Sequence, residues 1–446
     1  RFGWKKTTCD ERKLKYMMKA KVITLGCKVN QYESEAMLSS LLQHGFAAAE
    51  DKETADVVIL NSCTVTAESD RKVRQIFRRA KKDNPDAVMV LTGCMAQAFP
   101  EDARRLEEAD IILGTSNRKR LVPDLLAFLS ARQRIIDIAP HTNDEKFENL
   151  NVENFTGRTR AFVKIEDGCN RFCSYCIIPY ARGRVRSKPL EDLKAELAGL
   201  GANGYKEVVL TGINLSAYGQ EFGLHLCDAI EAACATPGIE RVRLGSLEPE
   251  QLSEDVIRRM AKQKKLCPQF HLSLQSGCDA TLKRMNRHYT ADEYRTIVRN
   301  LRAAFENAAI TTDIMVGFAG ETDEEFAESL AFAEEIAFAK VHVFAYSRRP
   351  GTRAYDMGDQ LTNAVKEARS HEMIRVTTAT QQAFFKAQIG RTEEVLFERE
   401  IQKGVWEGYS MNYTPVAVAS GTSLAGEIRS VRIENCTDTH CMGVVL

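Results

Sequence analysis

Three cysteines lie within eight residues, in the stretch CNRFCSYC at positions 169–176. Cys169, Cys173 and Cys176 have the spacing C-x3-C-x2-C, and no second cysteine pair of the kind that completes a zinc site follows them. Iron–sulfur clusters and structural zinc sites usually take four protein ligands. Three thiolates can hold three irons of a four-iron, four-sulfur cluster and leave the fourth iron open for a substrate or a cofactor. The spacing therefore indicates a cluster whose missing ligand is part of its function.

Three more cysteines each follow a short apolar run near the amino end. Cys27 follows KVITL, Cys63 follows DVVIL and Cys94 follows AVMVL. Such runs are typical of strands buried on both faces, and the carboxyl ends of parallel strands share one edge of a sheet, where ligands bind. We therefore expect these three cysteines to converge in space. The alternative is that they are ordinary buried cysteines.

The elements that must position both groups follow a β/α alternation, which predicts the α/β fold class. Residues 21–134 predict a small parallel α/β domain, and the polar residues 135–158 predict a linker. Residues 159–386 predict a partial (β/α)6 barrel, two strands short of a complete one, with CNRFCSYC at the carboxyl ends of its strands. Residues 387–446 predict a small all-β domain. The six expected barrel strands lie near 161–165, 207–210, 241–244, 270–274, 312–316 and 341–346.

Length and composition limit the class of protein. The chain has 446 residues, 44% of them apolar, and 61 basic residues balance 61 acidic ones, so any basic surface must be local. Its 13 cysteines lack the dense spacing of a secreted disulfide scaffold, and no apolar run is long enough to span a membrane. Residues 1–20 predict a leader or an expression remnant, with the start near Met17 or Met18. We expect a cytoplasmic protein that does not contact a membrane.

The sequences around both cysteine groups resemble those of one enzyme family. An aromatic residue, Tyr175, precedes the last cysteine of the motif, and the stretch EDGCNRFCSYCIIPYARGRVRS resembles the radical S-adenosylmethionine methylthiotransferases. TLGCKVNQYESE, NSCTVT and TGCMAQ resemble the amino domain of the same family. The resemblance runs from residue 21 to the end, where the β segment resembles a TRAM domain, an RNA-binding module. GCKVNQYE is most similar to the branch that modifies N6-threonylcarbamoyladenosine at tRNA position 37, whereas the isopentenyladenosine branch tends to carry GCQMN and the ribosomal-protein branch GCPKN.

This resemblance implies a reaction with two 4Fe-4S clusters and S-adenosylmethionine. Cys169, Cys173 and Cys176 would hold the cluster that binds S-adenosylmethionine and cleaves it to a 5′-deoxyadenosyl radical. Cys27, Cys63 and Cys94 would hold the auxiliary cluster, whose open iron carries the sulfur. A methylthio group would then replace the hydrogen on carbon 2 of the adenine. The implied partners are the anticodon loop of a tRNA, an electron donor protein and a sulfur donor, and we expect a monomer.

Residues at the ends of the expected barrel strands are the candidates for binding S-adenosylmethionine. Glycines let the backbone approach a ligand, and polar side chains can bond its ribose or its carboxylate. Each could also be an ordinary residue of a βα turn, and Arg287 an ordinary solvated arginine. The candidates are Tyr175, Thr211, Gly212, Asn214, Ser246, Glu248, Gln275, Ser276, Arg287, Gly317 and Phe318.

Two basic stretches are candidate contacts for RNA phosphates. Residues 71–82 contain seven basic residues and no acidic one, with an apolar stripe at helical spacing, so they predict a helix with a basic outer face. The stretch ARGRVRSK would carry its charges on one side if extended. The C-terminal domain is acidic by contrast, and we expect Trp406, Tyr409 or Tyr413 to stack on RNA. The basic candidates are Arg71, Lys72, Arg74, Arg78, Arg79, Arg182, Arg184 and Arg186.

Other functions stay open at this point. The chain could be a methylthiotransferase for isopentenyladenosine-37 of tRNA or for a ribosomal protein side chain. It could also be an RNA-binding protein without enzyme activity, in which iron–sulfur or zinc sites are structural. The remaining cysteines are expected to be packing residues: Cys9, Cys227, Cys234, Cys267, Cys278, Cys436 and Cys441.

Overall fold

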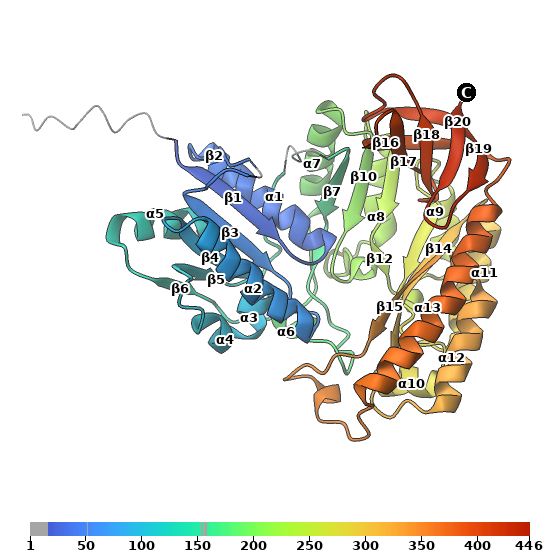
Figure 1. Cartoon of the computed structure of the whole chain (residues 1–446), viewed down its shortest axis with the longest axis horizontal. Coiled ribbons are helices and arrows are strands. Elements are labelled where there is room, and N and C mark those ends of the chain that lie inside the picture. The colour runs from blue at the N-terminus through green and yellow to red at the C-terminus, as the bar shows by residue number, and fades with distance from the viewer. Residues whose placement is uncertain (1–16, 51, 153–154, 156–157) are drawn as a thin grey trace, which may run out of the picture.

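Three parts follow one another along the chain in the computed structural model, which describes residues 17–50, 52–152, 155 and 158–446 (Figure 1). A parallel α/β unit comes first, an open α/β barrel follows, and a small β barrel ends the chain. The predicted α/β architecture is therefore confirmed. Residues 1–16 of the expected leader, with Cys9, lie outside the described residues, and residues 19–20 already belong to the first strand. Apart from the start of the expected linker, the domain boundaries stay predictions.

The first part is a six-stranded, entirely parallel sheet with the order β2-β1-β3-β4-β5-β6. Every residue of β3 and β4 is buried, because two apolar clusters cover the two faces of the sheet. Its strands are β1 (Lys19–Thr24), β2 (Ala47–Ala48), β3 (Val57–Ser62), β4 (Val88–Gly93), β5 (Ile111–Leu113) and β6 (Ile135–Asp137). Its helices are α1 (Lys28–Gln43), α2 (Ala67–Asp83), α3 (Cys94–Ala98), α4 (Pro100–Arg104) and α5 (Leu121–Ala131). We expected the linker to begin at residue 135. This is wrong for residues 135–137, because they form β6, which pairs with β5.

Helix α2 has the amphipathic form that the sequence predicts. The Thr66 side chain accepts a hydrogen bond from the Ser69 amide and so caps the helix. Val73, Phe77 and Ala80 are buried against the sheet, so most of the basic side chains remain on the opposite face.

The six strands expected in the second part are present and form an arc that is split into two sheets. One has the order β11-β10-β7 and the other β12-β13-β14-β15. β11 and β12 are separated only by Gly245 and pair with different sheets, so one strand passes from the first sheet to the second. The strands are β7 (Arg160–Lys164), β10 (Glu207–Thr211), β11 (Arg241–Leu244), β12 (Ser246–Leu247), β13 (Gln269–Leu272), β14 (Ala309–Val316) and β15 (Lys340–Ala345), with a small ribbon of β8 (Glu166–Asp167) and β9 (Arg186–Ser187).

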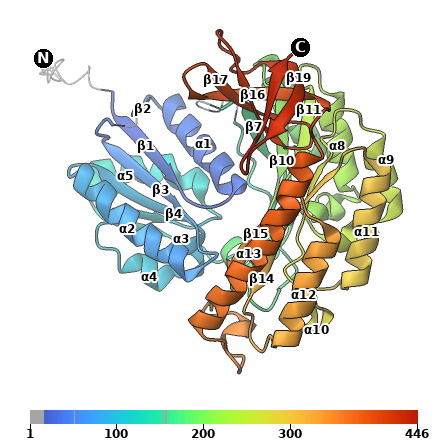
Figure 2. The same ribbon diagram turned by 45° about the vertical axis from the view of Figure 1, so that its right-hand side comes forward.

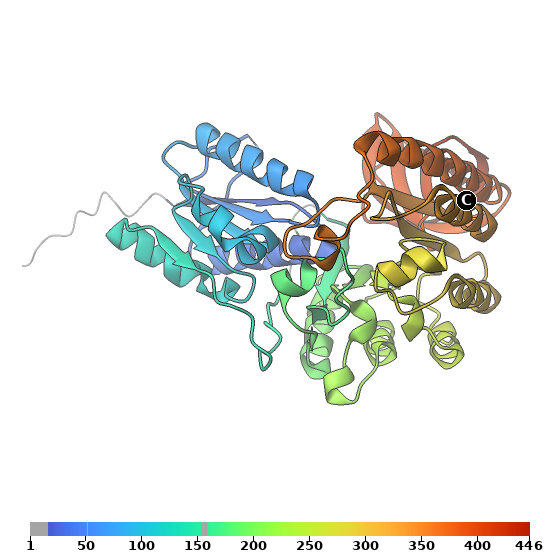
Figure 3. The same cartoon turned by 90° about the horizontal axis from the view of Figure 1, so that it is seen from below.

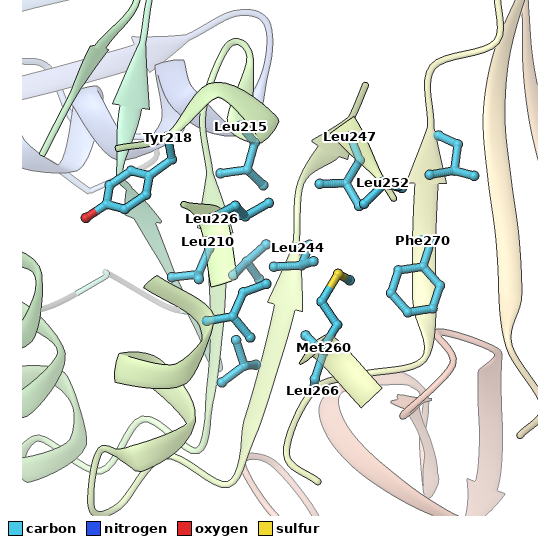
Figure 4. Packing of buried hydrophobic residues seen from close by; sticks show 14 of the residues in the cluster. Leu210, Leu215, Tyr218, Leu226, Leu244, Leu247, Leu252, Met260, Leu266 and Phe270 are labelled. Atoms are coloured by element: carbon cyan, nitrogen blue, oxygen red, sulfur yellow. The ribbon is translucent and has the colours of Figure 1, made fainter. Parts of the chain in front are cut away.

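Helices cover the outside of this arc. The α-helices are α6 (Ile178–Arg182), α7 (Leu190–Ala202), α8 (Leu226–Ala235), α9 (Glu254–Ala261), α10 (Asp279–Arg284), α11 (Ala291–Ala304), α12 (Asp323–Ile336) and α13 (Asn363–Lys386). Short 3-10 turns lie at Arg118–Arg120, Leu215–Ala217, Gln220–Phe222, Pro249–Gln251 and Arg353–Tyr355. Figure 4 shows the core between strands and helices, where Leu210, Leu244 and Phe270 from three strands meet Met260 of α9. No helix of the described residues has the length and apolar character needed to cross a membrane.

The chain ends in a closed five-stranded barrel with the order β16-β17-β18-β20-β19, reached through the long helix α13 (Figure 2). The strands are β16 (Thr392–Gln402), β17 (Val405–Ser410), β18 (Pro415–Ala419), β19 (Ile428–Cys436) and β20 (Cys441–Val445). Arg241 and Arg243 donate hydrogen bonds to backbone carbonyls of this barrel. Tyr409 and Tyr413 stack on each other, with ring centroids 4.5 Å apart, and lie against the guanidinium of Arg160. Arginines of the second part thus contact both half-buried rings, and the expected stacking of Trp406, Tyr409 or Tyr413 on RNA stays a prediction.

The arc is open between its two edge strands, β7 and β15. Helix α1 of the first part packs against β7. Beyond β15, the chain reaches back to the first part, where Arg349 forms an ion pair with Asp70 of α2 at 2.6 Å (Figure 3). The first part thus contacts both sides of the opening.

Phe270 offers a test of the core of the arc. Its side chain is fully buried and packs against Phe305, with the two rings tilted by 60°. We expect Phe270→Ala to lower the free energy of unfolding by about 3–5 kcal/mol, because the cavity loses packing as well as buried area. Phe222→Ala, which truncates a ring that is 50% exposed, is the matched control and should change it by less than about 0.5 kcal/mol. Urea unfolding followed by circular dichroism measures both, and equal effects would contradict the assigned packing.

Candidate functional site

The loop with the three clustered cysteines follows β7 and β8 and leads into α6. Gly168 has φ +85°, and a Cβ there would lie 2.0 Å from the carbonyl oxygen of Arg184, so only glycine fits where the loop begins. The backbone of Ser174 bonds Met285 and Ala354, at 2.9 and 2.7 Å. These contacts fix the shape of the loop from outside.

The three thiols of this loop are close enough to affect one another's pKa. Burial raises the pKa of Cys176 to about 12, and the neighbouring Cys173 raises it further. Burial likewise raises the pKa of Cys169, and Cys176 and Cys173 add to the effect. Metal coordination deprotonates a thiol outright, so a bound metal would offset this penalty.

The second group of cysteines lies at the carboxyl edge of three adjacent strands. Cys27 follows β1, Cys63 follows β3 and Cys94 begins α3 after β4. A Cβ on Gly26 would lie 3.2 Å from the Cys63 sulfur, which shows how closely the first two loops approach. Burial raises the pKa of Cys94 to about 12. Arg182 lowers this pKa, whereas Cys63 and Cys27 raise it. The structure therefore brings together three cysteines that are distant in sequence.

All twelve described cysteines are free thiols, as both sites require. In the described residues, no group of three or more His, Cys, Asp or Glu side chains is arranged to hold a single metal ion. The ligands of a four-iron cluster bind different irons, so a cluster does not require such a group. Three convergent free thiols in each site, with an arginine against one of them, fit an anionic iron–sulfur cluster.

One buried arginine contacts each cysteine group. The Arg182 guanidinium lies 3.3 Å from the Cys94 sulfur, and the Arg287 guanidinium lies 3.4 Å from the Cys173 sulfur. Both side chains are nearly inaccessible to solvent. A fixed positive charge in a water-poor site favours thiolates and anionic clusters, so the two arginines have the same electrostatic effect at the two sites.

Arg182 is also the centre of a buried charge network between the first two parts. Its guanidinium lies 2.6 Å from Glu33 of α1 and 3.3 Å from Asp167 of β8, and it donates to the Asn30 amide oxygen at 2.5 Å. Lys164 of β7 bonds both Glu33, at 2.7 Å, and Asp167, at 2.5 Å. A second arginine, Arg118, lies 2.9 Å from Glu33.

Two of the expected RNA contacts are wrong because of this burial. Arg182 is completely buried, and Arg186 is 6% exposed and bonds the carbonyls of Arg182 and Arg184. Arg184, between them, is exposed and lies over the Phe172 ring. In α2, Arg71, Lys72, Arg78 and Arg79 are exposed and Arg74 is half-buried, and three of these arginines pair with surface carboxylates.

The candidate residues for S-adenosylmethionine do not all meet. Tyr175 is part of the cluster loop, and Arg287 and Glu248 lie beside it, where Arg287 pairs with Glu248 at 2.6 Å. Phe318 is fully buried between Tyr175 and Tyr346, so its expected stacking on an adenine is wrong for this conformation.

The other candidates lie around the strand ends. Gly212 and Asn214 pack on Glu166. Ser246 is exposed on β12. Gln275 has φ +73°, and its backbone forms a β-bridge with Ile314 of β14. Thr211 and Ser276 are buried, and Ser276 caps the Cys278 amide. A Cβ on Gly317 would lie 2.4 Å from Lys366.

The residue that sequence reasoning missed here is Glu166. It is fully buried and accepts a hydrogen bond from the Asn214 amide at 2.7 Å. Its other oxygen, and the side-chain oxygen of Asn214, have no hydrogen-bond partner among the described residues. Buried acceptors without a donor are unfavourable, so this pair suits a ligand that carries N–H groups. No sequence pattern distinguishes such a glutamate from a surface one.

Comparisons with known proteins match two segments of the chain to family models. Residues 19–114 match a family described as Uncharacterized protein family UPF0004, and residues 163–333 match the Radical SAM superfamily. The chain is 36% identical to the threonylcarbamoyladenosine tRNA methylthiotransferase MtaB of Bacillus subtilis over 92% of each chain. It is 37% identical to the protein of the same name from Thermotoga maritima, over 95% of this chain and 96% of that one.

Relatives from a second group and one solved structure extend the comparison. The tRNA-2-methylthio-N(6)-dimethylallyladenosine synthase of Pelotomaculum thermopropionicum is 34% identical over 96% of this chain and 98% of that one. The radical S-adenosylmethionine methyltransferase TsrM from Kitasatospora setae, with tryptophan substrate and an S-adenosylmethionine analogue bound, matches with a TM-score of 0.57. That match has 15% sequence identity and covers 76% of this chain and 75% of that one, so it concerns the fold alone.

Removing Arg182 should strongly destabilise the protein. Arg182→Met leaves Glu33 and Asp167 short of a buried positive charge, which should lower the free energy of unfolding by about 3–5 kcal/mol. Arg71→Met breaks an exposed pair and is the control, with an expected change of less than about 1 kcal/mol. Similar losses in the two variants, measured by urea unfolding, would contradict the role of the network.

The same network predicts a pH dependence of stability. Burial alone would raise the pKa of Glu33, but Arg118, Arg182 and Lys164 outweigh it and lower the pKa from 4.5 to about 2. Because the folded pKa lies below the unfolded one, this contribution to stability is present above about pH 4.5 and is lost as the pH falls toward 2. Glu33→Gln should therefore flatten the decline of the free energy of unfolding over this range. An unchanged slope would show that Glu33 is not the group responsible.

Proposed function

The chain belongs to the tRNA methylthiotransferases that contain a radical S-adenosylmethionine domain, and we propose that it inserts the methylthio group at carbon 2 of N6-threonylcarbamoyladenosine at tRNA position 37. As a member of this family it is an enzyme that transfers methylthio groups, and it uses S-adenosylmethionine and a 4Fe-4S cluster. The choice of substrate rests on one observation. Relatives named for threonylcarbamoyladenosine match at 36% and 37% identity over more than nine-tenths of each chain.

We assign the clusters to the two cysteine groups. Cys169, Cys173 and Cys176 would hold the cluster of the radical S-adenosylmethionine domain, and Cys27, Cys63 and Cys94 a second one. When bound, these groups supply one-electron reduction of S-adenosylmethionine and the sulfur atom to be inserted. An electron donor protein and a sulfur donor are further parts of the proposal. The tRNA substrate makes the cytoplasm the proposed location, and the monomeric state stays a prediction.

The protein's own residues prepare both sites. Arg182 and Arg287 hold positive charge against Cys94 and Cys173, which favours the deprotonated thiols that metal binding needs. Glu248 pairs with Arg287 and so orients it toward the cluster loop. Glu166 and Asn214 present unpaired acceptors that would take the amino group of S-adenosylmethionine.

Exposed arginines on two elements would bind the tRNA backbone. The outer face of α2 begins a few residues after Cys63, and Arg184 lies on the segment that follows the cluster loop. Phosphate contacts of this kind position RNA and weaken as salt increases.

The dimethylallyladenosine substrate is the second candidate, because relatives of that name match at 34–37% identity. Transfer RNA from a strain that lacks the gene separates the two candidates. We expect mass spectrometry of digested tRNA to show loss of the methylthio form of threonylcarbamoyladenosine alone. Loss of the methylthio dimethylallyl nucleoside would select the other branch, and unchanged tRNA would refute the proposal.

Cysteine variants test the two cluster assignments. The wild-type protein, reconstituted without oxygen, should hold about eight irons, and each variant about four. Cys176→Ala should abolish release of 5′-deoxyadenosine, whereas Cys63→Ala should keep that cleavage and lose methylthiolation. Cys227→Ala, at a buried cysteine of α8 outside both groups, is the control and should keep the full iron content. Sulfur insertion by Cys63→Ala would contradict the second assignment.

A further inference from the structure

The segment that follows β15 contacts the loops of both cysteine groups (Figure 3). At one end, the hydroxyl of Ser347 accepts a hydrogen bond from the Ala67 amide at 3.1 Å, where α2 of the first part begins. At the other end, the Ala354 amide donates to the carbonyl of Ser174 at 2.7 Å, inside the stretch CNRFCSYC. We call residues 347–355 the bridge segment, because they connect the first part of the chain to the cluster loop of the second.

Arg349 anchors the bridge segment in the first part. Its guanidinium donates hydrogen bonds to the Thr64 hydroxyl at 2.7 Å and to the Asp70 carboxylate at 2.6 Å. The Thr64 hydroxyl in turn donates to the other carboxylate oxygen of Asp70 at 2.7 Å. All three residues are buried, and hydrogen bonds are stronger where water is excluded. Because Thr64 directly follows Cys63, this closed set of bonds reaches the backbone beside a cysteine of the second group.

Arg349 also contacts the helix that begins at another cysteine of this group. Its guanidinium lies over the Phe99 ring, 4.8 Å from the centroid, and Phe99 directly follows α3, which begins at Cys94. A guanidinium over the face of an aromatic ring is a favourable contact. One buried side chain thus contacts both the loop after Cys63 and the end of the helix that begins at Cys94.

The bridge segment is also fixed on the side of the cluster loop. The Thr352 hydroxyl and the Thr352 amide both donate to the carbonyl of Arg349, at 2.7 and 3.2 Å, which closes a tight turn. Ala354 is fully buried beside Met285, in the apolar group against which Tyr175 of the cluster loop packs. Arg349 is therefore joined to the cluster loop through a short, hydrogen-bonded stretch of backbone.

We propose that Arg349 is a positioning residue that holds the loop of Cys63 at a set distance from the cluster loop, residues 169–176. This inference rests on the proposed function and deepens it. In that reaction, hydrogen removal and sulfur insertion take place at the same carbon of the adenosine, so the two cysteine groups must face one point. A misplacement of 1 Å between reacting groups can lower a rate about a hundredfold. Arg182 already contacts Cys94, and Arg349 adds a separate contact on the other side of the opening.

A purely stabilising role is the alternative, and the two roles predict different results. If Arg349 only stabilised the fold, its loss would lower the amount of folded protein and reduce every activity in proportion. A positioning role leaves the release of 5′-deoxyadenosine intact, because that release needs only the site at the cluster loop. It lowers the number of methylthio groups formed per 5′-deoxyadenosine released. Positioning is the better explanation, because the bonds of Arg349 end beside Cys63 rather than on the outer surface of the first part.

Two variants of the reconstituted full-length protein test this role. Arg349→Met removes the guanidinium, and Thr64→Val removes the hydroxyl beside Cys63 with little change of shape. The first measurement is hydrogen–deuterium exchange followed by mass spectrometry. Exchange of the amides of residues 64–70 should become about tenfold faster in Arg349→Met, as expected for the loss of a charge-assisted hydrogen bond, and should also rise in Thr64→Val. The amides of β10, in the core of the arc, should exchange as in the wild type.

The second measurement counts the products formed on an anticodon stem–loop that carries N6-threonylcarbamoyladenosine at position 37. Mass spectrometry gives both the methylthio groups formed and the 5′-deoxyadenosine released in the same sample. We expect both variants to release 5′-deoxyadenosine as the wild type does. The ratio of methylthio groups to 5′-deoxyadenosine should fall about tenfold or more in Arg349→Met and in the same direction in Thr64→Val.

Two matched controls separate positioning from damage to the loop. Thr64→Ser keeps the hydroxyl at the same position and should keep both the exchange and the product ratio close to those of the wild type. Arg353→Met replaces an exposed arginine of the same bridge segment and should do the same. Every variant should hold about eight irons, as expected for the wild type, so that a lost cluster does not account for a lower ratio.

The outcomes either support the inference or overturn it. Faster exchange with an unchanged product ratio would show that Arg349 only stabilises the fold and would overturn the inference. Unchanged exchange, or a proportional loss of both products, would overturn it as well. If Arg349→Met does not fold, the comparison of Thr64→Val with Thr64→Ser decides alone. A wild type that releases 5′-deoxyadenosine but adds no methylthio group to this stem–loop would refute the proposed substrate instead, and the ratio is then measured on the nucleoside that the tRNA digest identifies.

Discussion

The interaction on which the site depends is the buried ion network around Arg182. Arg182 reaches Glu33 and Asn30 on α1, Asp167 on β8 and the Cys94 sulfur with one guanidinium. These groups belong to two different parts of the chain, so the network fixes how the first part is held against the arc. Charges removed from water are tolerated only when they are paired in good geometry. The network therefore helps to hold the two cysteine groups in one relative position, together with the ion pair between Arg349 and Asp70.

The two cysteine groups have the same arrangement of charges, although different elements of the fold position them. One is local, on a loop held by bonds to Met285 and Ala354, and the other is assembled from the ends of three parallel strands. Each has a buried arginine against one sulfur, and each arginine is held by a carboxylate, Glu33 or Glu248. Burial penalises the thiolates and the arginine offsets that penalty. Such sites are unfavourable without a metal cluster, which explains why so much of the surrounding structure supports them.

The opening between β7 and β15 gives the arc a face that a closed barrel would fill with side chains. In a complete eight-stranded barrel the interior is a packed core. Here β15 leaves Lys340, His342 and Phe344 exposed on the face that the core does not use. The first part of the chain contacts both sides of this opening.

The sequence determined the elements and the local site. Apolar runs and helical patterns predicted the strands of both α/β parts, because burial on both faces of a parallel sheet requires continuous apolar residues. Spacing identified Cys169, Cys173 and Cys176, and their common place after strands identified Cys27, Cys63 and Cys94. Tertiary structure decided the rest. Arg182 and Arg186 look like surface charges in the sequence but are buried, and Phe318 is enclosed by two tyrosines. Glu33 and Glu166 stand in stretches that resemble the family, but nothing in those stretches shows that they are buried, because a charged side chain gains its role only from the partners that folding brings to it.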